Sequence, residues 1–201
     1  MSAKIVAIVG SYRKDGVTER AVEAVLEGAR ARGAETRKFL LRETYLEFCT
    51  NCRSCTQVPG ETRGRCAQQD GLEEILTAVE AADAVVLASP VNYYNTTALF
   101  RRFLERLLGY LYWPWGKKIP ELRSTRRPRK AVLVACSGAP GFLIPLTTGA
   151  ARALRMAAGM LGAKPVGHLW IGLVAGEPLP ALPARVRKRA LRLGGEIAVS
   201  H

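Results

Sequence analysis

The chain has 201 residues, of which 48% are hydrophobic and 23% are charged, and its formal net charge is +13. These proportions are ordinary for a globular domain, so they exclude a disordered, collagen-like or coiled-coil chain. A chain of this length can bury roughly 70% of its unfolded surface without disulfides, and its excess of Lys and Arg favours anionic partners.

The first predicted element is a strand over residues 4–9, a continuous run of apolar and β-branched residues. Such a run is typical of a strand that is buried on both faces of a parallel sheet. A polar loop follows, and then a helix over 18–32 whose apolar residues recur at i, i+3, i+4 and i+7. A weaker and more polar strand over 36–41 suits the edge of a sheet.

The alternation of strand and helix continues to the end of the chain. We expect further strands at 84–88, 131–135 and 166–174, and helices near 72–79, 100–111, 145–161 and 184–199. Alternating strands and helices require crossover connections, which produce a parallel sheet with helices on both faces. The sequence therefore predicts a three-layer α/β sandwich that binds its ligand at the carboxyl ends of the strands.

Two irregular stretches interrupt this pattern, and we interpret both as insertions. Residues 42–70 hold four cysteines, and residues 110–128 are first aromatic and then basic. A long irregular stretch inside a compact domain is usually functional. The aromatic residues 110–115 could cap a site in a neighbouring subunit or form a small satellite core.

The loop after the first strand, residues 10–18, combines features that suit an anion. Ser11 and Thr18 supply hydroxyl donors, Arg13 supplies a charge, and Gly16 lets the backbone approach closely. The amides at the start of the following helix favour a phosphate at the same place. The loop has no Walker or Gly-x-Gly-x-x-Gly motif, and a plain turn with Thr18 as the helix N-cap remains the alternative.

Two more loops follow predicted strand ends. Residues 89–97 place two adjacent tyrosines between asparagines, which suits a flat conjugated ring, although the tyrosines could simply cover the core. Residues 136–141 are small and glycine-containing, so a ring could pass close to their backbone, although a plain turn has the same composition. Because all three loops leave the same edge of the sheet, we expect them to meet.

The first two of these loops resemble those of the flavodoxin-like NAD(P)H-dependent FMN reductases, including their iron–sulfur flavoprotein branch. The matching positions are Gly10, Ser11, Arg13, Gly16, Thr18, Ser89, Pro90, Val91, Tyr93, Asn95, Arg101, Phe103, Leu104, Glu105 and Arg106. Three positions depart from the family's pattern. Val17 and Asn92 stand where Asn and Tyr are common, and Tyr94 replaces a glycine.

The resemblance implies a flavodoxin-like sandwich with a five-stranded parallel sheet in the order 2-1-3-4-5, and one FMN-binding domain over residues 1–201. It implies FMN as the cofactor, NAD(P)H as the reductant, and a homodimer or homotetramer with flavin sites at subunit interfaces. The FMN-binding residues expected on this basis are Ser11, Arg13, Gly16, Val17, Thr18, Pro90, Val91, Asn92, Tyr93, Tyr94, Asn95, Ser137, Gly138 and Ala139.

The four cysteines of residues 42–70 are Cys49, Cys52, Cys55 and Cys66. The C-x2-C-x2-C spacing lets three sulfurs converge from one tight loop, and a remote cysteine can close the site. The motif resembles that of the iron–sulfur flavoproteins, which implies a [4Fe–4S] cluster, although the last gap is longer here. A zinc site and four metal-free thiols remain open as alternatives. We interpret Cys136, which follows a buried strand, as a small hydrophobic residue.

We therefore expect an FMN-dependent oxidoreductase that uses NAD(P)H to reduce a quinone, a flavin or another small acceptor. No catalytic acid or base is expected, because the flavin supplies the difficult chemistry. The first alternative is an iron–sulfur flavoprotein that transfers electrons to a redox protein. The second is a basic nucleic-acid-binding protein, suggested by the basic runs 117–130 and 185–192 but disfavoured because no nucleic-acid motif accompanies them.

Two features of the sequence bear on where the protein works. No uninterrupted apolar stretch of about 18 residues is present, so we expect no membrane span. The first residues do not form a secretory signal, and five cysteines are typical of thiols or ligands in a reducing compartment. We therefore expect a cytoplasmic protein.

Overall fold

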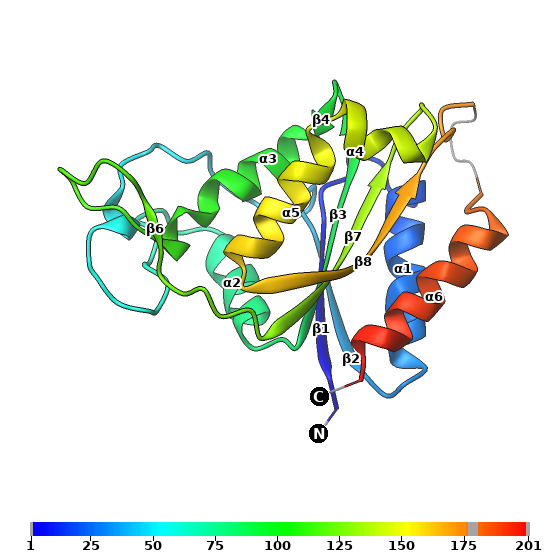
Figure 1. Ribbon diagram of the computed structural model, residues 1–201, viewed down its shortest axis with the longest axis horizontal. Helices are drawn as coiled ribbons and strands as arrows, with labels where there is room; N and C mark the ends of the chain where they lie inside the picture. The colour runs from blue at the N-terminus through cyan, green and yellow to red at the C-terminus, as the bar shows by residue number, and fades with distance from the viewer. Residues whose placement is uncertain (1, 177–180, 200–201) are drawn as a thin grey trace.

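The computed structural model of the protein describes residues 2–176 and 181–199. Its main sheet has the order β2-β1-β3-β7-β8, and all neighbouring strands on this path are parallel (Figure 1). The five strands are β1 (Lys4–Val9), β2 (Glu35–Leu40), β3 (Ala84–Asn92), β7 (Arg129–Cys136) and β8 (Ala163–Ile171). This order confirms the predicted 2-1-3-4-5 topology, since β7 and β8 are the fourth and fifth strands of the parallel sheet.

Helices cover both faces of the sheet, as the alternating pattern predicts (Figure 1). On one face lie α1 (Val17–Arg30) and α6 (Ala184–Ile197). On the other face lie α2 (Leu72–Glu80), α3 (Ala98–Glu105) and α5 (Ala150–Met160). The two buried clusters are separated by the sheet, whose central strands are apolar on both sides. Within the described ranges, no helix has the length and hydropathy needed to cross a membrane.

Several short elements complete the chain. They are η1 (Ser54–Thr56), β4 (Asn95–Thr96), η2 (Arg106–Tyr110), β5 (Leu111–Tyr112), β6 (Glu121–Leu122), η3 (Gly141–Leu143) and α4 (Ile144–Thr147). Strand β4 folds back on the end of β3 as a small hairpin, and β5 pairs with β6. Both pairs lie outside the strand pattern that the sequence predicts, because two-residue strands have no periodicity to detect.

Two predicted helices are broken in the structure. The helix expected over 100–111 is α-helical only to Glu105 and continues as the 3-10 helix η2. The helix expected over 145–161 is divided into α4 and α5 at Gly149, whose amide donates to the carbonyl of Tyr94 (2.8 Å). A Cβ at Gly149 would lie 2.8 Å from the Asn95 side chain. The break therefore admits the β3–β4 hairpin, and no local sequence signal encodes that approach.

Helices α1 and α6 approach each other at backbone distance. A Cβ added at Gly28 would lie 2.0 Å from the carbonyl oxygen of Leu191, and one at Gly194 would lie 1.9 Å from that of Val25. Both contacts are too short for any side chain, so the two glycines permit this helix packing. The next residue, Gly195, has only ordinary contacts at 3.7 Å.

We predict that Gly194→Ala lowers the free energy of unfolding by about 1–3 kcal/mol, because the two helices must separate to admit the methyl group. The neighbouring control Gly195→Ala should be neutral or raise the free energy of unfolding by about 0.5–1 kcal/mol, because alanine favours the helix. Urea unfolding followed by circular dichroism measures both. Equal effects of the two substitutions would contradict the close packing of α1 on α6.

Candidate functional site

A cleft of about 290 Å³ lies at the carboxyl ends of β1, β3 and β7. The three loops that the sequence predicts to meet all contribute to it. Its lining comprises Ser11, Tyr12, Arg13, Gly16, Val17, Thr18, Pro90, Val91, Asn92, Thr97, Cys136, Ser137, Gly138, Val174 and Ala175. The volume is close to the lower end, roughly 300 Å³, of typical ligand sites, and the walls combine hydroxyls, backbone and small apolar groups.

Four of the predicted residues lie outside this lining: Tyr93, Tyr94, Asn95 and Ala139. Tyr93 is 97% exposed and Tyr94 is 75% exposed, and both have positive φ at the tip of the β3–β4 hairpin. The Asn95 side chain accepts from the amide of Thr96. The hairpin projects beyond the carboxyl ends of the central strands (Figure 1), and its tyrosines do not line the cleft.

Five lining residues were missed from the sequence: Tyr12, Thr97, Cys136, Val174 and Ala175. Thr97 carries a detectable signal, because a threonine directly before an apolar helix is a typical N-cap. Val174 and Ala175 follow β8, whose carboxyl end lies beside that of β7. Including the loop after the last strand would have found them.

Thr97 connects the first two loops. Its buried hydroxyl donates to the carbonyl of Gly10 (2.5 Å) and accepts from the amide of Phe100 (3.2 Å), which caps α3. Its own amide donates to the hydroxyl of Ser89 (3.0 Å). A Cβ at Gly10 would lie 2.6 Å from the Cβ of Phe100, so glycine lets the first loop sit directly on the start of α3.

The first loop leaves the amides at the start of α1 available. The N-cap of α1 is Gly16, with no side-chain cap from the described residues, and Thr18 lies in the first turn with its side chain buried. The prediction of Thr18 as the N-cap is therefore wrong, since Gly16 occupies that position. The hydroxyl of Ser11 exchanges 3.3 Å hydrogen bonds with the backbone of Arg13. An uncapped helix N-terminus beside hydroxyl groups is a suitable place for an anion.

Cys136 forms part of the cleft wall as a buried residue (3% exposed). Burial raises the pKa of its thiol to about 12, against the opposing effect of a hydrogen bond from Thr18. The thiol is therefore neutral at physiological pH and is no nucleophile. This agrees with its interpretation as a small hydrophobic residue.

The four remaining cysteines lie in residues 42–70. Cys49, Cys55 and Cys66 are half-buried and Cys52 is exposed, and all four are thiols. Burial raises the pKa of Cys55, and the charges of Cys66, Cys49 and Cys52 raise it further, so these three cysteines lie within electrostatic range of Cys55. Among the described residues, no three Cys, His, Asp or Glu side chains form a ready metal site.

A buried guanidinium fixes both ends of the cysteine segment. Arg106 donates to the carbonyl of Glu47 (2.6 Å), to the carboxylate of Asp70 (2.7 Å) and to the sulfur of Cys66 (3.4 Å). The side chains of Arg106 and Asp70 are fully buried. Burial acts to raise the pKa of Asp70, but hydrogen bonds from Arg106 and from two backbone amides outweigh burial and lower it.

Two more arginines hold the middle of the segment. Arg53 lies between the rings of Trp113 and Trp115, at 3.9 and 4.2 Å from their centroids. Arg123 donates to four carbonyl oxygens, those of Cys55, Val58, Gly60 and Gly109. The aromatic residues 110–115 thus pack on the cysteine segment of the same chain, and the cation–π contacts help to order it.

The chain matches one family model and several curated proteins. The model of the NADPH-dependent FMN reductase family matches residues 3–174. An iron-sulfur flavoprotein of Archaeoglobus fulgidus is 37% identical over 111 residues, which is 55% of this chain and 48% of that protein. One of Methanocaldococcus jannaschii is 30% identical over 103 residues, 51% of each chain. The chain thus spans about half the length of these curated relatives.

Solved structures show the same fold. The NAD(P)H:quinone oxidoreductase from Methanothermobacter marburgensis superposes with a TM-score of 0.65 at 19% identity, covering 99% of this chain and 96% of that one. The azoreductase AzrA superposes with a TM-score of 0.66 at 13% identity, covering 96% and 100%. At these identities the likeness concerns the fold alone, which is flavodoxin-like, as predicted.

We predict that Thr97→Val lowers the free energy of unfolding by about 1–3 kcal/mol, because it removes the α3 cap and leaves the Gly10 carbonyl unpaired. Thr147→Val is the matched control, since that exposed hydroxyl bonds only within its own turn, and it should change stability by less than about 0.5 kcal/mol. Urea unfolding at neutral pH measures both. A Thr97→Val protein as stable as wild type would contradict the role of this hydroxyl.

We predict that Asp70→Asn costs about 3–5 kcal/mol at neutral pH, because it leaves the Arg106 cation buried without a counter-charge. Since the folded-state pKa of Asp70 is lowered, its contribution is full above the ordinary value of 3.8 and is lost as the pH falls through the folded value. The stability gap between wild type and Asp70→Asn should therefore narrow below pH 4.

Urea unfolding at a series of pH values measures this gap. Glu74→Gln is its control, because Glu74 pairs with Arg37 at the surface and its side chain is 62% exposed. That substitution should change stability by less than about 1 kcal/mol at every pH. A gap for Asp70→Asn that stays constant down to pH 3 would show that the ion pair does not contribute as described.

Proposed function

The chain belongs to the NADPH-dependent FMN reductase family, and from this premise we propose that it binds FMN in the cleft and uses NAD(P)H to reduce a small acceptor such as a quinone or a flavin. We propose that it acts as one FMN-binding domain. The observation that carries the proposal is the convergence of the loops after β1, β3 and β7 on one cleft. Ligands of open parallel sheets bind at this edge.

The residues of the cleft fit the parts of FMN. The hydroxyls of Ser11 and Thr18, the side chain of Arg13 and the uncapped amides of the first turn of α1 suit the phosphate. We assign the ring to Pro90, Val91, Asn92, Ser137 and Gly138 of the cleft. We assign its rim to four residues outside the cleft lining, namely Tyr93, Tyr94, Asn95 and Ala139. Gly16 and Val17 complete the phosphate loop. Most of these donors are neutral, so they do not cancel the negative charge of the phosphate. The positive end of the α1 helix dipole offsets part of that charge.

When bound, FMN supplies a ring that accepts hydride from NAD(P)H and passes the electrons on. The residues of this chain bind and orient that ring. The thiol of Cys136 in the cleft wall stays neutral because burial raises its pKa, so it is no competing nucleophile. We assign no proton transfer to a side chain.

A second function is supported by the cysteine segment: we propose that Cys49, Cys52, Cys55 and Cys66 bind a [4Fe–4S] cluster and that the protein passes electrons to a redox partner. Three thiols within electrostatic range of Cys55, with a buried cation on Cys66, suit an anionic thiolate cluster. The thiols must move closer together to enclose it, since the described residues hold no ready metal group. Zinc and metal-free thiols are the alternative states.

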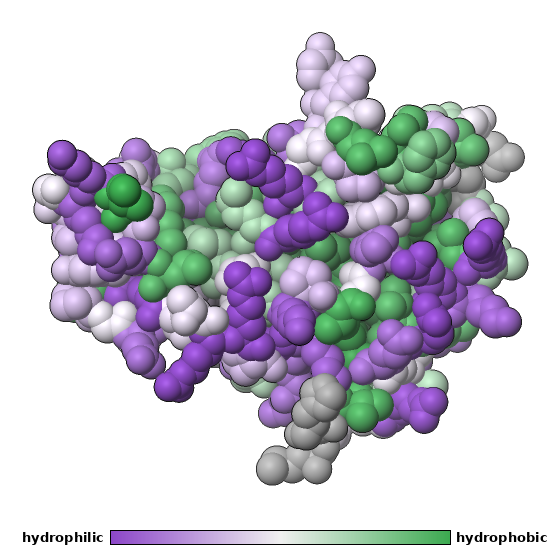
Figure 2. Space-filling model, in the orientation of Figure 1, coloured by the Kyte–Doolittle hydropathy of each residue, from purple (hydrophilic) through white to green (hydrophobic). Residues whose placement is uncertain are grey.

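An apolar patch beside the cleft supports a homodimer or homotetramer. Figure 2 shows apolar side chains gathered over α4, next to the projecting β3–β4 hairpin. Phe142 and Leu146 are 70% and 75% exposed there. Large exposed apolar residues on one patch are typical of an interface. We propose that a second copy covers this patch, and that the protein works in the cytoplasm, where its five thiols would stay reduced.

The basic runs give little support to a nucleic-acid function. The guanidinium groups of Arg123 and Arg129 donate hydrogen bonds to backbone carbonyls within the chain. Lys117 pairs with Glu121, and Arg187 pairs with Glu27. These four basic residues therefore have partners within the chain, which weakens the case for a surface that binds nucleic-acid phosphates.

The flavin assignment is tested on the purified full chain. We expect it to retain about one FMN per chain at micromolar concentration, because both loops and the helix N-terminus contribute, and to oxidise NADPH when a quinone is supplied. Equilibrium dialysis and absorbance at 340 nm measure these. Failure to retain FMN would overturn the proposal, whereas FMN binding without NADPH oxidation would favour the electron-transfer function.

The cluster assignment is tested by anaerobic purification. We expect about four irons and four sulfides per chain, as a [4Fe–4S] cluster requires. Cys66→Ser should lose the iron and keep the FMN, because Cys66 does not line the flavin cleft. A parallel Ser124→Ala protein should keep both, since the hydroxyl of Ser124 accepts from the amide of Arg126 outside the cysteine segment. One zinc per chain would instead establish the zinc site, and no metal would leave the cysteines as free thiols.

A further inference from the structure

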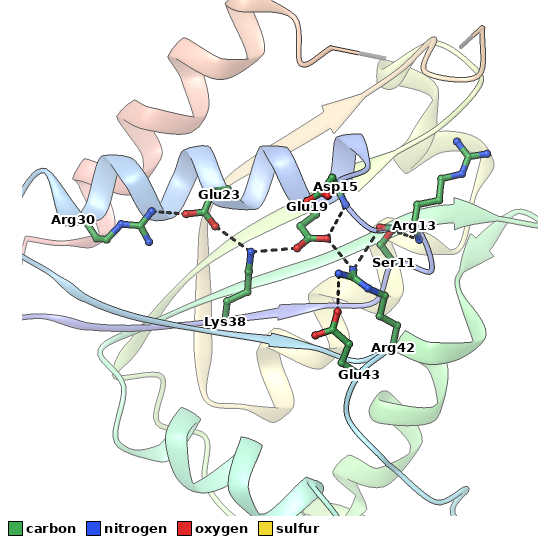
Figure 3. Close-up of polar contacts among 9 residues, drawn as sticks. All are labelled: Ser11, Arg13, Asp15, Glu19, Glu23, Arg30, Lys38, Arg42 and Glu43. Atoms are coloured by element: carbon green, nitrogen blue, oxygen red, sulfur yellow. Dashed lines mark hydrogen bonds and ion pairs between the residues drawn. The ribbon is translucent and has the colours of Figure 1, made fainter. Parts of the chain in front are cut away.

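A buried carboxylate lies directly behind the loop to which we assign the FMN phosphate. Glu19 is in the first turn of α1, and its side chain is 9% exposed. Its carboxylate accepts from Arg42 Nη1 (2.8 Å), Lys38 Nζ (3.2 Å) and the amide of Asp15 (3.3 Å) (Figure 3). An uncompensated carboxylate at this place would repel a phosphate dianion.

Arg42 joins this carboxylate to the loop itself. It follows β2 by two residues, and its side chain is 13% exposed. The same Nη1 that contacts Glu19 lies 3.5 Å from the carbonyl oxygen of Arg13, and Nη2 pairs with Glu43 (3.0 Å). The Arg13 carbonyl also accepts from the Ser11 hydroxyl (3.3 Å). One guanidinium therefore contacts both the loop backbone and the anion behind it (Figure 3).

The Glu19 carboxylate also holds the loop in its conformation. Asp15 has φ of 55°, in the left-handed region that a residue with a side chain rarely adopts. A glutamate at the third helical position commonly accepts from the N-cap amide. Here Glu19 instead accepts from the amide of Asp15, one residue before the N-cap Gly16. The contact ties the strained residue of the loop to the helix.

The charges of this cluster are balanced locally. Burial acts to raise the pKa of Glu19, but hydrogen bonds and charge attraction from Arg42 and Lys38 outweigh burial and lower it. The same pairing raises the pKa of Arg42, although burial acts to lower it. All three groups are ionised at neutral pH. Both cations are shared, Lys38 with Glu23 (3.1 Å) and Arg42 with Glu43 (3.0 Å). Arg42 makes the shorter contact with Glu19, 2.8 Å against 3.2 Å for Lys38, and it alone of the two also contacts the Arg13 carbonyl among the described residues.

We propose that Arg42 is a positioning residue for the FMN phosphate, acting by neutralising Glu19 and by holding the Arg13 carbonyl, without touching the ligand. The inference rests on the function proposed for the cleft. Among the described residues that line the cleft, Arg42 is absent, so its action must pass through Glu19 and the loop. We therefore expect loss of Arg42 to weaken the binding of ligands that carry the phosphate more than the binding of ligands that lack it.

The test compares FMN with riboflavin, which has the same ring and no phosphate. Both are titrated into the full-length apoprotein by quenching of flavin fluorescence. In Arg42→Met we expect the Kd for FMN to rise about 10- to 100-fold and the Kd for riboflavin to change less than about threefold, since a tenfold change in Kd corresponds to about 1.4 kcal/mol. Arg37→Met is the matched control, because Arg37 lies in β2 and makes an exposed ion pair with Glu74.

Two further variants separate positioning from general destabilisation. Glu19→Gln in the Arg42→Met background removes the repelling charge and keeps an acceptor for Asp15, so it should recover part of the FMN affinity. Arg42→Lys keeps the cation and loses the planar fork, so the FMN affinity should fall by about three- to tenfold with riboflavin unchanged. This variant provides the measurement if Arg42→Met does not fold.

The outcomes are distinct. Parallel losses of FMN and riboflavin affinity, or an unchanged FMN-to-riboflavin ratio in both Arg42 variants, would overturn the positioning role and leave the flavin function intact. A wild-type protein that binds neither flavin would overturn the proposed function and this inference with it. Selective loss of FMN affinity, recovered by Glu19→Gln, would establish the inference.

Discussion

The geometry of the cleft depends on one buried hydroxyl. Thr97 binds the carbonyl of Gly10, caps α3 at Phe100 and, through its amide, holds Ser89. The ends of β1 and β3 and the start of α3 are thereby joined into one unit. Leaving any of these buried groups unpaired would cost about 1–3 kcal/mol, so the two loops cannot move independently. The third loop is held separately, because the amide of Ser137 donates to the carbonyl of Ile171 at the end of β8.

In the cysteine segment, arginine side chains supply the backbone hydrogen bonds that secondary structure supplies elsewhere. Residues 42–70 contain only one short 3-10 helix, so few of their carbonyls have partners in a helix or a sheet. Guanidinium groups supply the donors: Arg123 binds carbonyls at Cys55, Val58 and Gly60, and Arg106 binds that of Glu47. Each guanidinium offers five donors in a rigid plane, which suits carbonyls that converge from several directions. These two arginines, which contribute to the +13 net charge, therefore stabilise the fold.

Much of the fold could be predicted, because buried parallel strands are continuous apolar runs. The runs at 4–9, 84–88 and 131–135 lie within β1, β3 and β7. Elsewhere the prediction of elements and site residues was wrong, because segments distant in the sequence pack against each other. Gly149 breaks a helix so that the β3–β4 hairpin can approach, and the same hairpin carries Tyr93 outward to 97% exposure. Its two tyrosines have the composition of a ring-binding wall, but a turn with positive φ at both residues points them away from the cleft.

The sequence by itself determined the parallel sheet, the loops that meet at its carboxyl edge and the type of donors they offer, because strand periodicity and loop composition are local properties. Only the tertiary structure decided which side chains share the cleft and which charges lie behind it. Arg42 and Glu19 are 23 residues apart, and Arg53 and Trp113 are 60 apart. Such pairs form because parallel crossovers bring distant segments together, and no window of the chain contains both partners.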